Sequence, residues 1–304
     1  MVRQRLFRQD EPEWHRKIQM KKIGIIAKPQ NTHAVKKILD DLLPWLARQE
    51  KEVILDTDTA SIAGLASPYQ KSKVPSLVEM LIVLGGDGTL LSVARLVEGK
   101  DVPILGVNLG GLGFLTEVTV EELFSTLGKI FKNEFVTDDR LMLKAIVHRQ
   151  GERVAHSLVL NDVVISKGTL ARMIKLEIFI NSQFVTALRG DGLILATPTG
   201  STAYSLSAGG PIVYPSVEAM VITPISPHTL TNRPIVIPND VHVEAVLKTR
   251  EEGTTVTFDG QVGFSLRHED VVEIWTADSK IKLIRSPQRN YYEVLRRKLK
   301  WGEG

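Results

Sequence analysis

One segment limits the fold of this chain more than any other, because an apolar run passes directly through a glycine-rich loop into a second apolar stretch. Residues 80–84 read Met-Leu-Ile-Val-Leu, which predicts a buried strand, and residues 90–97 carry apolar residues typical of a helix. The loop between them reads Gly85-Gly86-Asp87-Gly88-Thr89. A strand that turns tightly into a helix is the repeating unit of a parallel sheet covered by helices.

The same loop indicates a chemistry. Glycines at a strand-to-helix turn let backbone N–H groups approach a ligand, and a helix N-terminus favours phosphate, so Gly85, Gly86, Gly88 and Thr89 form a candidate phosphate loop. Asp87 would repel that phosphate. The conflict disappears if its carboxylate meets a hydroxyl group that receives a phosphoryl group. A tight turn whose aspartate caps the helix explains the same residues about as well.

The remainder of the first half repeats the alternation of strand and helix. It predicts an α/β class, with an N-terminal Rossmann-like domain over residues 20–138 and helices on both faces of a parallel sheet. Ligands of such sheets bind beyond the carboxyl ends of the strands, where the loop at 85–89 and a second glycine-rich segment at 108–113 both fall. The expected strands are 22–27, 53–55, 80–84 and 102–107, and the clearest expected helices are 33–49, 90–97 and 120–132.

After residue 138 the pattern changes to short alternating or β-branched runs between turn residues, without long helical patterns. This predicts an all-β second part, an antiparallel β-sandwich-like domain over residues 139–278. Residues 279–304 return to a strand followed by a helix and are expected to pack back on the α/β domain. Expected strands are 141–147, 155–160, 163–165, 174–180, 183–187, 193–197, 234–237, 242–247, 254–258 and 271–275.

Composition narrows the class of protein. The chain has no cysteine, a formal net charge of +3 and no apolar stretch near the ~18 residues that a membrane span needs, which predicts a cytoplasmic protein without membrane or nucleic-acid partners. The basic residues 1–19 are expected to be a disordered extension, either a loose arm or the consequence of a start at Met20. Near the other end, Tyr292, Leu295 and Leu299 predict an amphipathic helix that docks on the protein rather than on a membrane surface.

Two further segments have the composition of a nucleoside site. Asn161 can read an adenine edge and Asp162 can accept from ribose hydroxyls, although an Asn-Asp pair is also typical of a turn. Residues 197–211 are small, hydroxyl-bearing or turn-forming apart from Tyr204 and Leu206, which suits a nucleoside pocket and also a flexible linker. The segments 189–192 and 258–261 have the composition of ordinary hairpin turns.

Taken in order, these segments resemble the NAD kinases over most of residues 20–290. The matching motifs are Gly-Gly-Asp-Gly-Thr at 85–89, Gly-Val-Asn-x-Gly-x-Leu-Gly-Phe-Leu at 106–115, Leu-Asn-Asp at 160–162, Thr-Pro-Thr-Gly-Ser-Thr-Ala-Tyr-Ser at 197–205 and Asp-Gly-Gln at 259–261. The resemblance implies NADP biosynthesis by transfer of the γ-phosphoryl group of ATP to the adenosine 2′-hydroxyl of NAD. It also implies a divalent metal, with Mg²⁺ expected, polyphosphate as a second candidate donor, and a homodimer or homotetramer.

The resemblance assigns residues as well. It makes Asp87 the catalytic carboxylate, acting as a general base that mainly orients the hydroxyl, because an ordinary aspartate is too weakly basic to deprotonate an alcohol early. It places NAD between the two domains, with the contacts Asp87, Gly88, Asn161, Asp162, Arg172, Arg189, Asp191, Thr202, Ala203, Tyr204, Ser205, Leu206, Ser207 and Gln261.

Two other functions share part of this sequence. A lipid kinase of the diacylglycerol or sphingosine type would use the same aspartate loop on a membrane substrate, but it would not need the segment 197–211. A non-catalytic NAD(P)-binding sensor would keep Asn161 and that segment without needing Asp87. Because both features occur in one chain, a nucleotide kinase is favoured over either alternative.

Overall fold

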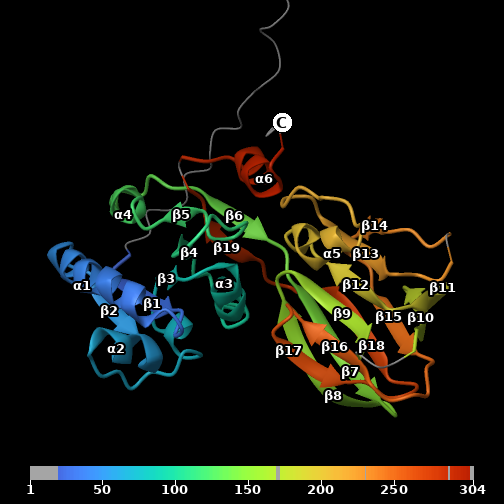
Figure 1. The fold of residues 1–304 in the computed structure, drawn as a ribbon. Coiled ribbons are helices and arrows are strands. Elements are labelled where there is room, and N and C mark those ends of the chain that lie inside the picture. Colours follow the sequence, from blue (N-terminus) through green and yellow to red (C-terminus); the bar gives the residue numbers. More distant parts are fainter. Residues whose placement is uncertain (1–19, 169–171, 230, 287, 302–304) are drawn as a thin grey trace, which may run out of the picture.

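A mixed sheet dominated by parallel strands organises the first part of the chain (Figure 1). The computed structural model describes residues 20–168, 172–229, 231–286 and 288–301, so the extension predicted at 1–19 lies outside the described residues. The strands of this sheet are β1 (Lys22–Ala27), β2 (Glu52–Leu55), β3 (Met80–Leu84), β4 (Ile104–Asn108), β5 (Val118–Thr119), β6 (Thr137–Arg140) and β19 (Ile281–Ile284). Their order is β2-β1-β3-β4-β19-β6, with β5 beside β4, and only β6 runs antiparallel to its neighbour.

Helices cover both faces of this sheet because alternate residues of a strand point to opposite sides. From β3, Met80, Ile82 and Leu84 pack with one group of helices, whereas Leu81 and Val83 pack on the other face. The first face carries α1 (Thr32–Arg48), α2 (Thr57–Ala63) and α4 (Leu123–Phe131). The second carries the short turn η1 (Val74–Ser76) and α3 (Asp87–Ala94).

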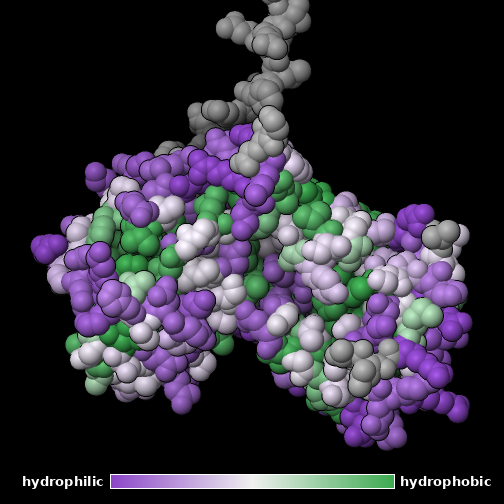
Figure 2. Space-filling view, in the orientation of Figure 1, coloured by the Kyte–Doolittle hydropathy of each residue, from purple (hydrophilic) through white to green (hydrophobic). Residues whose placement is uncertain are grey.

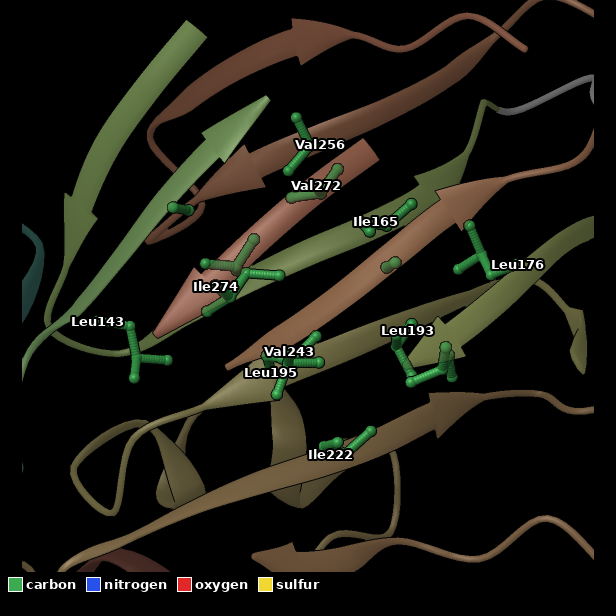
Figure 3. Packing of buried hydrophobic residues seen from close by; sticks show 14 of the residues in the cluster. Leu143, Ile165, Leu176, Leu193, Leu195, Ile222, Val243, Val256, Val272 and Ile274 are labelled. Carbon is green, nitrogen blue, oxygen red and sulfur yellow. The ribbon is translucent and has the colours of Figure 1, made fainter. Parts of the chain in front are cut away.

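The second body is two stacked antiparallel sheets, which confirms the predicted fold class. Side chains from both sheets fill the space between them, as Figure 3 shows for Leu143, Leu176 and Val272 from one sheet and Ile165, Leu195 and Val256 from the other. One sheet holds β7 (Leu143–Arg149), β8 (Glu152–Val159), β10 (Ile174–Ile180), β11 (Gln183–Gly190), β15 (Val243–Leu247) and β18 (Val271–Thr276). The other holds β9 (Asp162–Lys167), β12 (Gly192–Ala196), β13 (Ala219–Ile225), β14 (Ile235–Pro238), β16 (Thr254–Phe258) and β17 (Val262–Ser265).

The two bodies meet along one side of α3. Leu90 and Val93 of this helix share a buried cluster with Leu158 and Leu160 of the β-rich body. Beyond this contact the bodies diverge, and the space-filling view shows a notch between them (Figure 2). The short 3-10 turn η2 (Gly200–Thr202) and α5 (Tyr204–Ser207) follow β12, so the segment 197–211 is folded rather than a linker.

The last helix, α6 (Tyr291–Leu299), lies over the junction of the two bodies (Figure 1). Its buried side chains are Tyr291, Val294 and Leu295, so the predicted docking face is shifted: Tyr292 is 60% exposed. None of the helices in the described ranges is long and apolar enough to cross a membrane.

Three local predictions need correction. Helix α3 begins at Asp87 rather than at residue 90, because Thr89 and Leu90 already donate their backbone N–H groups to the Gly86 carbonyl. The segment 189–192 is not a hairpin turn, since it carries the chain from β11 in one sheet to β12 in the other. The strands β5, β6, β13 and β17 were not expected from the sequence. The predicted domain boundaries at 138 and 278 remain predictions.

Candidate active site

Asp87 occupies the first turn of α3, but its side chain does not cap the helix. The helix begins after Gly86 without a side-chain capping bond. The carboxylate instead accepts hydrogen bonds from the backbone N–H groups of Phe114 at 2.9 Å, Leu115 at 3.2 Å and Thr116 at 3.0 Å, and from the Thr116 hydroxyl at 2.9 Å. Four donors therefore fix the carboxylate between the two glycine-rich segments, and the helix N-terminus adds favourable electrostatics.

A cavity of 320 Å³ opens beside Asp87 at the carboxyl ends of β1, β3 and β4. Two lysines and one carboxylate supply its charged groups. Glycines supply four of the ten lining residues, and the two lysines outnumber the one carboxylate. This is the composition of a site for a phosphate chain. The lining residues are Lys28, Asn31, Gly86, Asp87, Asn108, Leu109, Gly110, Gly111, Gly113 and Lys298.

The segments at 160–162 and 197–205 pack closely against each other in the β-rich body. The Thr197 backbone N–H donates to the Asn161 carbonyl, and the Thr197 hydroxyl donates to the Leu160 carbonyl. Gly200 lies so close to Asn161 that a Cβ atom there would stand 2.0 Å from the Asn161 carbonyl oxygen. A glycine at 200 is therefore required for this contact, which brings Asn161 beside the turn that carries Thr202 and Tyr204.

The turn between β16 and β17 contacts both the segment at 160–162 and the loop that carries Asp87. Asp259 and Gly260 both have positive φ, as a two-residue hairpin turn requires. The Asp259 carboxylate accepts from the backbone N–H groups of Leu160, Asn161 and Asp162. Two residues later, the Gln261 amide donates to the Gly88 carbonyl at 2.6 Å. One hairpin thus holds Asn161 and Gly88 in a fixed relation.

Asp162 is a buried carboxyl beside a second buried carboxyl. Burial, together with the nearby charge of Asp259, raises the pKa of Asp162 to about 7. Burial also raises the pKa of Asp259, opposed by the backbone N–H groups that donate to it. Two like charges in a desolvated site disfavour double ionisation, so the pair holds a proton into the neutral range.

This proton makes stability depend on pH. Because the pKa of Asp162 is higher in the folded than in the unfolded chain, its contribution is complete below about pH 4 and is lost as the pH rises towards 7. We expect the free energy of unfolding to fall over this window by up to about 4 kcal/mol from this group. Asp162→Asn should flatten the slope in urea titrations from pH 4 to 8. Asp191→Asn, at a half-exposed residue paired with Lys167, should keep it; equal slopes in wild type and Asp162→Asn would contradict the assignment.

Apart from Asp87, Gly88, Asp162 and Gln261, which are described above, the predicted NAD contacts form two groups. Asn161, Thr202, Ala203, Tyr204, Leu206 and Ser207 gather at the carboxyl end of β12, where Tyr204 is 46% exposed. Ser205 is there too, but it is buried, with its hydroxyl bonded to Thr223. Asp191 lies at the opposite end of β12, since Gly192 pairs with Ser166 while Ala196 pairs with Asp162, roughly 15 Å along the strand. Arg172 and Arg189 are exposed near that far end.

Comparison with known proteins decides the family. The model of the ATP-NAD kinase N-terminal domain matches residues 23–135, and that of the ATP-NAD kinase C-terminal domain matches residues 160–286. The chain belongs to the NAD kinase family. This confirms the resemblance predicted from the motifs and makes the chain a phosphotransferase with NAD kinase activity.

The sequences of individual NAD kinases match this chain over nearly its whole length. The NAD kinase of Syntrophotalea carbinolica is 50% identical over 285 residues, which cover 93% of this chain and 100% of that protein. That of Geobacter sulfurreducens is 46% identical over 284 residues, with the same coverage. The crystal structure of yeast NADH kinase complexed with NADH has a TM-score of 0.87 at 26% identity, covering 94% of this chain and 89% of that one. An NAD kinase from Archaeoglobus fulgidus in complex with ATP shares the fold, with a TM-score of 0.72 and 23% identity.

Several residues of this NAD kinase site were not assigned by sequence reasoning. Asp259 appeared only as part of a turn and of the Asp-Gly-Gln motif, without a role of its own, yet it anchors the Asn161 loop. Arg95 of the helical turn that ends α3 donates to Gln261 and so supports the same hairpin. Lys28 and Lys298 line the cavity from opposite ends of the chain. Their sequence surroundings carry no motif, so only the fold brings them to the site.

Proposed function

We propose that the cavity beside Asp87 binds the phosphates of ATP and that the pocket around Asn161 binds the adenosine part of NAD. The γ-phosphoryl group would then pass to the adenosine 2′-hydroxyl and give NADP. The observation that best supports this proposal is the hydrogen bond from Gln261 to the Gly88 carbonyl, because the hairpin that carries Gln261 also holds the Asn161 segment through Asp259. Phosphoryl-transfer catalysis consists almost entirely of positioning the donor and acceptor and of electrostatic stabilisation.

Asp87 has a defined part in this reaction. As the 2′-oxygen bonds to the γ-phosphorus and the bond to the β-phosphate oxygen breaks, the hydroxyl proton passes to the Asp87 carboxylate and ADP leaves. The transition state is loose, so the proton leaves late and a weak base suffices. The four donors on the carboxylate fix its direction, which suits the role of orienting the hydroxyl. We extend the same role of orientation to Asn161 and Tyr204 on the adenosine side.

The residues of the cavity are compatible with Mg²⁺ carried by the donor. The described residues contain no group of three His, Cys, Asp or Glu side chains that could hold a metal ion without a substrate. Mg²⁺ prefers one or two carboxylates together with phosphate oxygens and water, and the cavity offers one carboxylate, that of Asp87. When bound, the metal ion would neutralise charge on the phosphates.

The experiment is NADP formation, followed with an NADP-specific dehydrogenase. NAD, ATP and Mg²⁺ should give rapid turnover, and excess EDTA should stop it until Mg²⁺ is restored. Polyphosphate is tested as the donor in a parallel reaction. Tight NAD binding without turnover from either donor would support the sensor instead, and transfer to diacylglycerol vesicles in place of NAD would support a lipid kinase.

The assembly and location of the protein remain predictions. We propose a homodimer or homotetramer, supported by exposed apolar side chains on the edge strands β11 and β14, namely Phe184, Ile235 and Val236. We also propose a cytoplasmic location, supported by the lack of cysteine. Sedimentation velocity and cell fractionation test these two statements.

A further inference from the structure

The start of α6 is fixed firmly to the α/β body. Arg289 donates to both carboxylate oxygens of Glu122, at 2.6 and 2.7 Å, and to the Glu117 carbonyl. The helix then begins with a capping box in which Asn290 and Glu293 exchange hydrogen bonds between side chain and backbone. A bidentate ion pair of low exposure followed by a complete cap leaves the first turn of the helix little freedom.

The β-rich body holds the same turn from the other side. The ring of Tyr291 meets that of Tyr214 at a centroid distance of 5.0 Å in an edge-to-face arrangement. Tyr214 lies three residues after the segment 197–211, which we propose for the adenosine pocket. The side chains of Val294 and Leu295, on the same helix, are also buried. The direction of α6 is therefore set by both bodies, and so is the position of the residues one to two turns later.

Lys298, in the last turn of α6, reaches the cavity beside Asp87. Its side chain lines the cavity together with Gly86, Asp87 and Gly110. The ammonium group lies 5.7 Å from the centre of the Phe114 ring, and the backbone N–H of Phe114 donates to Asp87. Contact with a ring face steers a lysine without neutralising it.

The charge of Lys298 is free for a ligand. Among the described residues no carboxylate lies within 4.0 Å of its ammonium group, whereas Lys248 and Lys280 have such partners. Lys28 approaches the same cavity from the end of β1. Two cations and four glycines line the cavity together with one carboxylate, which itself is already engaged by four donors. The cavity thus favours a ligand with several negative charges.

We propose that Lys298 binds the terminal phosphates of the nucleoside triphosphate donor, so that the C-terminal helix supplies part of the donor site. The proposal rests on the proposed function for the identity of the donor, but the chemistry it states is that of a polyphosphate chain. A lysine acts on such a chain as a mobile point charge, and the glycine-rich loops line the same cavity. The helix that carries it is held by the adenosine side as well, which links the two halves of the site.

The test compares three substitutions in the full-length protein. Lys298→Met keeps a side chain that can lie on Phe114 and removes the charge. Lys298→Arg keeps the charge. Arg297→Met removes an exposed charge from the same helix at a residue that does not line the cavity. Lys298→Met should raise the KM for ATP about tenfold and leave the KM for NAD within about twofold, because one charge-assisted phosphate contact is lost. Lys298→Arg should restore most of the loss, and Arg297→Met should resemble wild type.

A binding measurement separates this proposal from the proposed function. Calorimetric titration with Mg²⁺ and inorganic tripolyphosphate, without NAD, should show about tenfold weaker binding by Lys298→Met than by wild type or Arg297→Met. That result would support Lys298 even if the wild type made no NADP. Equal tripolyphosphate affinities and equal KM values for ATP in Lys298→Met and Arg297→Met would overturn the proposal while NADP formation by the wild type stood. Circular dichroism and thermal melting verify that each variant is folded.

Discussion

Asp87→Asn should lower kcat for NADP formation by about 10²–10⁴, the usual contribution of a positioned general base. The amide keeps the size of the side chain but cannot take the hydroxyl proton. It also turns one acceptor oxygen into a donor that faces the N–H groups of residues 114–116, so the loop loses part of its support. The dissociation constant for NAD should change less than about threefold, because most of the predicted NAD contacts lie on the other body.

The matched control is Asp58→Asn, which places the same substitution at an exposed aspartate in the first turn of α2. It should leave kcat within about twofold of wild type. A large loss of NAD affinity in Asp87→Asn with an unchanged kcat would assign Asp87 to binding rather than to the chemical step.

Gly200→Ala should damage the acceptor pocket severely. The new methyl group would stand 2.0 Å from the backbone carbonyl oxygen of Asn161, and neither atom can rotate away, so the two segments must separate. Overpacking of this kind costs about 1–3 kcal/mol of folding free energy, and displacement of Asn161 should raise the KM for NAD at least about tenfold. The KM for ATP should change much less, since the donor cavity is built from other segments.

Gly128→Ala is the control for this substitution. Gly128 lies inside α4, where a methyl group would meet no atom of another segment within 4 Å, and alanine is the better helix former. That variant should be as active as wild type and up to about 1 kcal/mol more stable. If Gly200→Ala bound NAD normally, the close packing of residues 161 and 200 would not be what shapes the pocket.

The parts of the fold that the sequence predicted are those encoded locally. The β3–α3 unit was recognisable because five apolar residues, a glycine-rich loop and a helical pattern follow one another within 20 residues. The bounds of strands β10 and β16 were also predicted to the residue, because each strand is an alternating or β-branched run. Strand β6 was not expected, since Thr-Asp-Asp-Arg has a polar composition and becomes a strand only through its pairing with β19, over 140 residues away.

In the candidate site, too, some residues are marked by a local motif and others are brought there only by the fold. Asp87 and Asn161 stand in motifs that are themselves unusual, so sequence alone pointed to them. Asp259 stands in an Asp-Gly turn like many others, and its bonds to residues 160–162 span about 100 positions of the chain. Lys298 lies in a basic helix whose other cations, Arg296 and Arg297, are not among the residues that line the cavity. No local pattern separates it from Arg297, because the fold alone decides which of them reaches the cavity.

The most direct test of the account is to follow the phosphoryl group itself. The protein is incubated with NAD, Mg²⁺ and ATP labelled with ³²P at the γ-position, and the dinucleotide product is digested to locate the label. The account predicts one label per NADP, all of it on the adenosine 2′-oxygen, and almost none with Asp87→Asn. Label released as inorganic phosphate, or carried on any other hydroxyl group of NAD, would contradict the proposed arrangement of donor, Asp87 and acceptor.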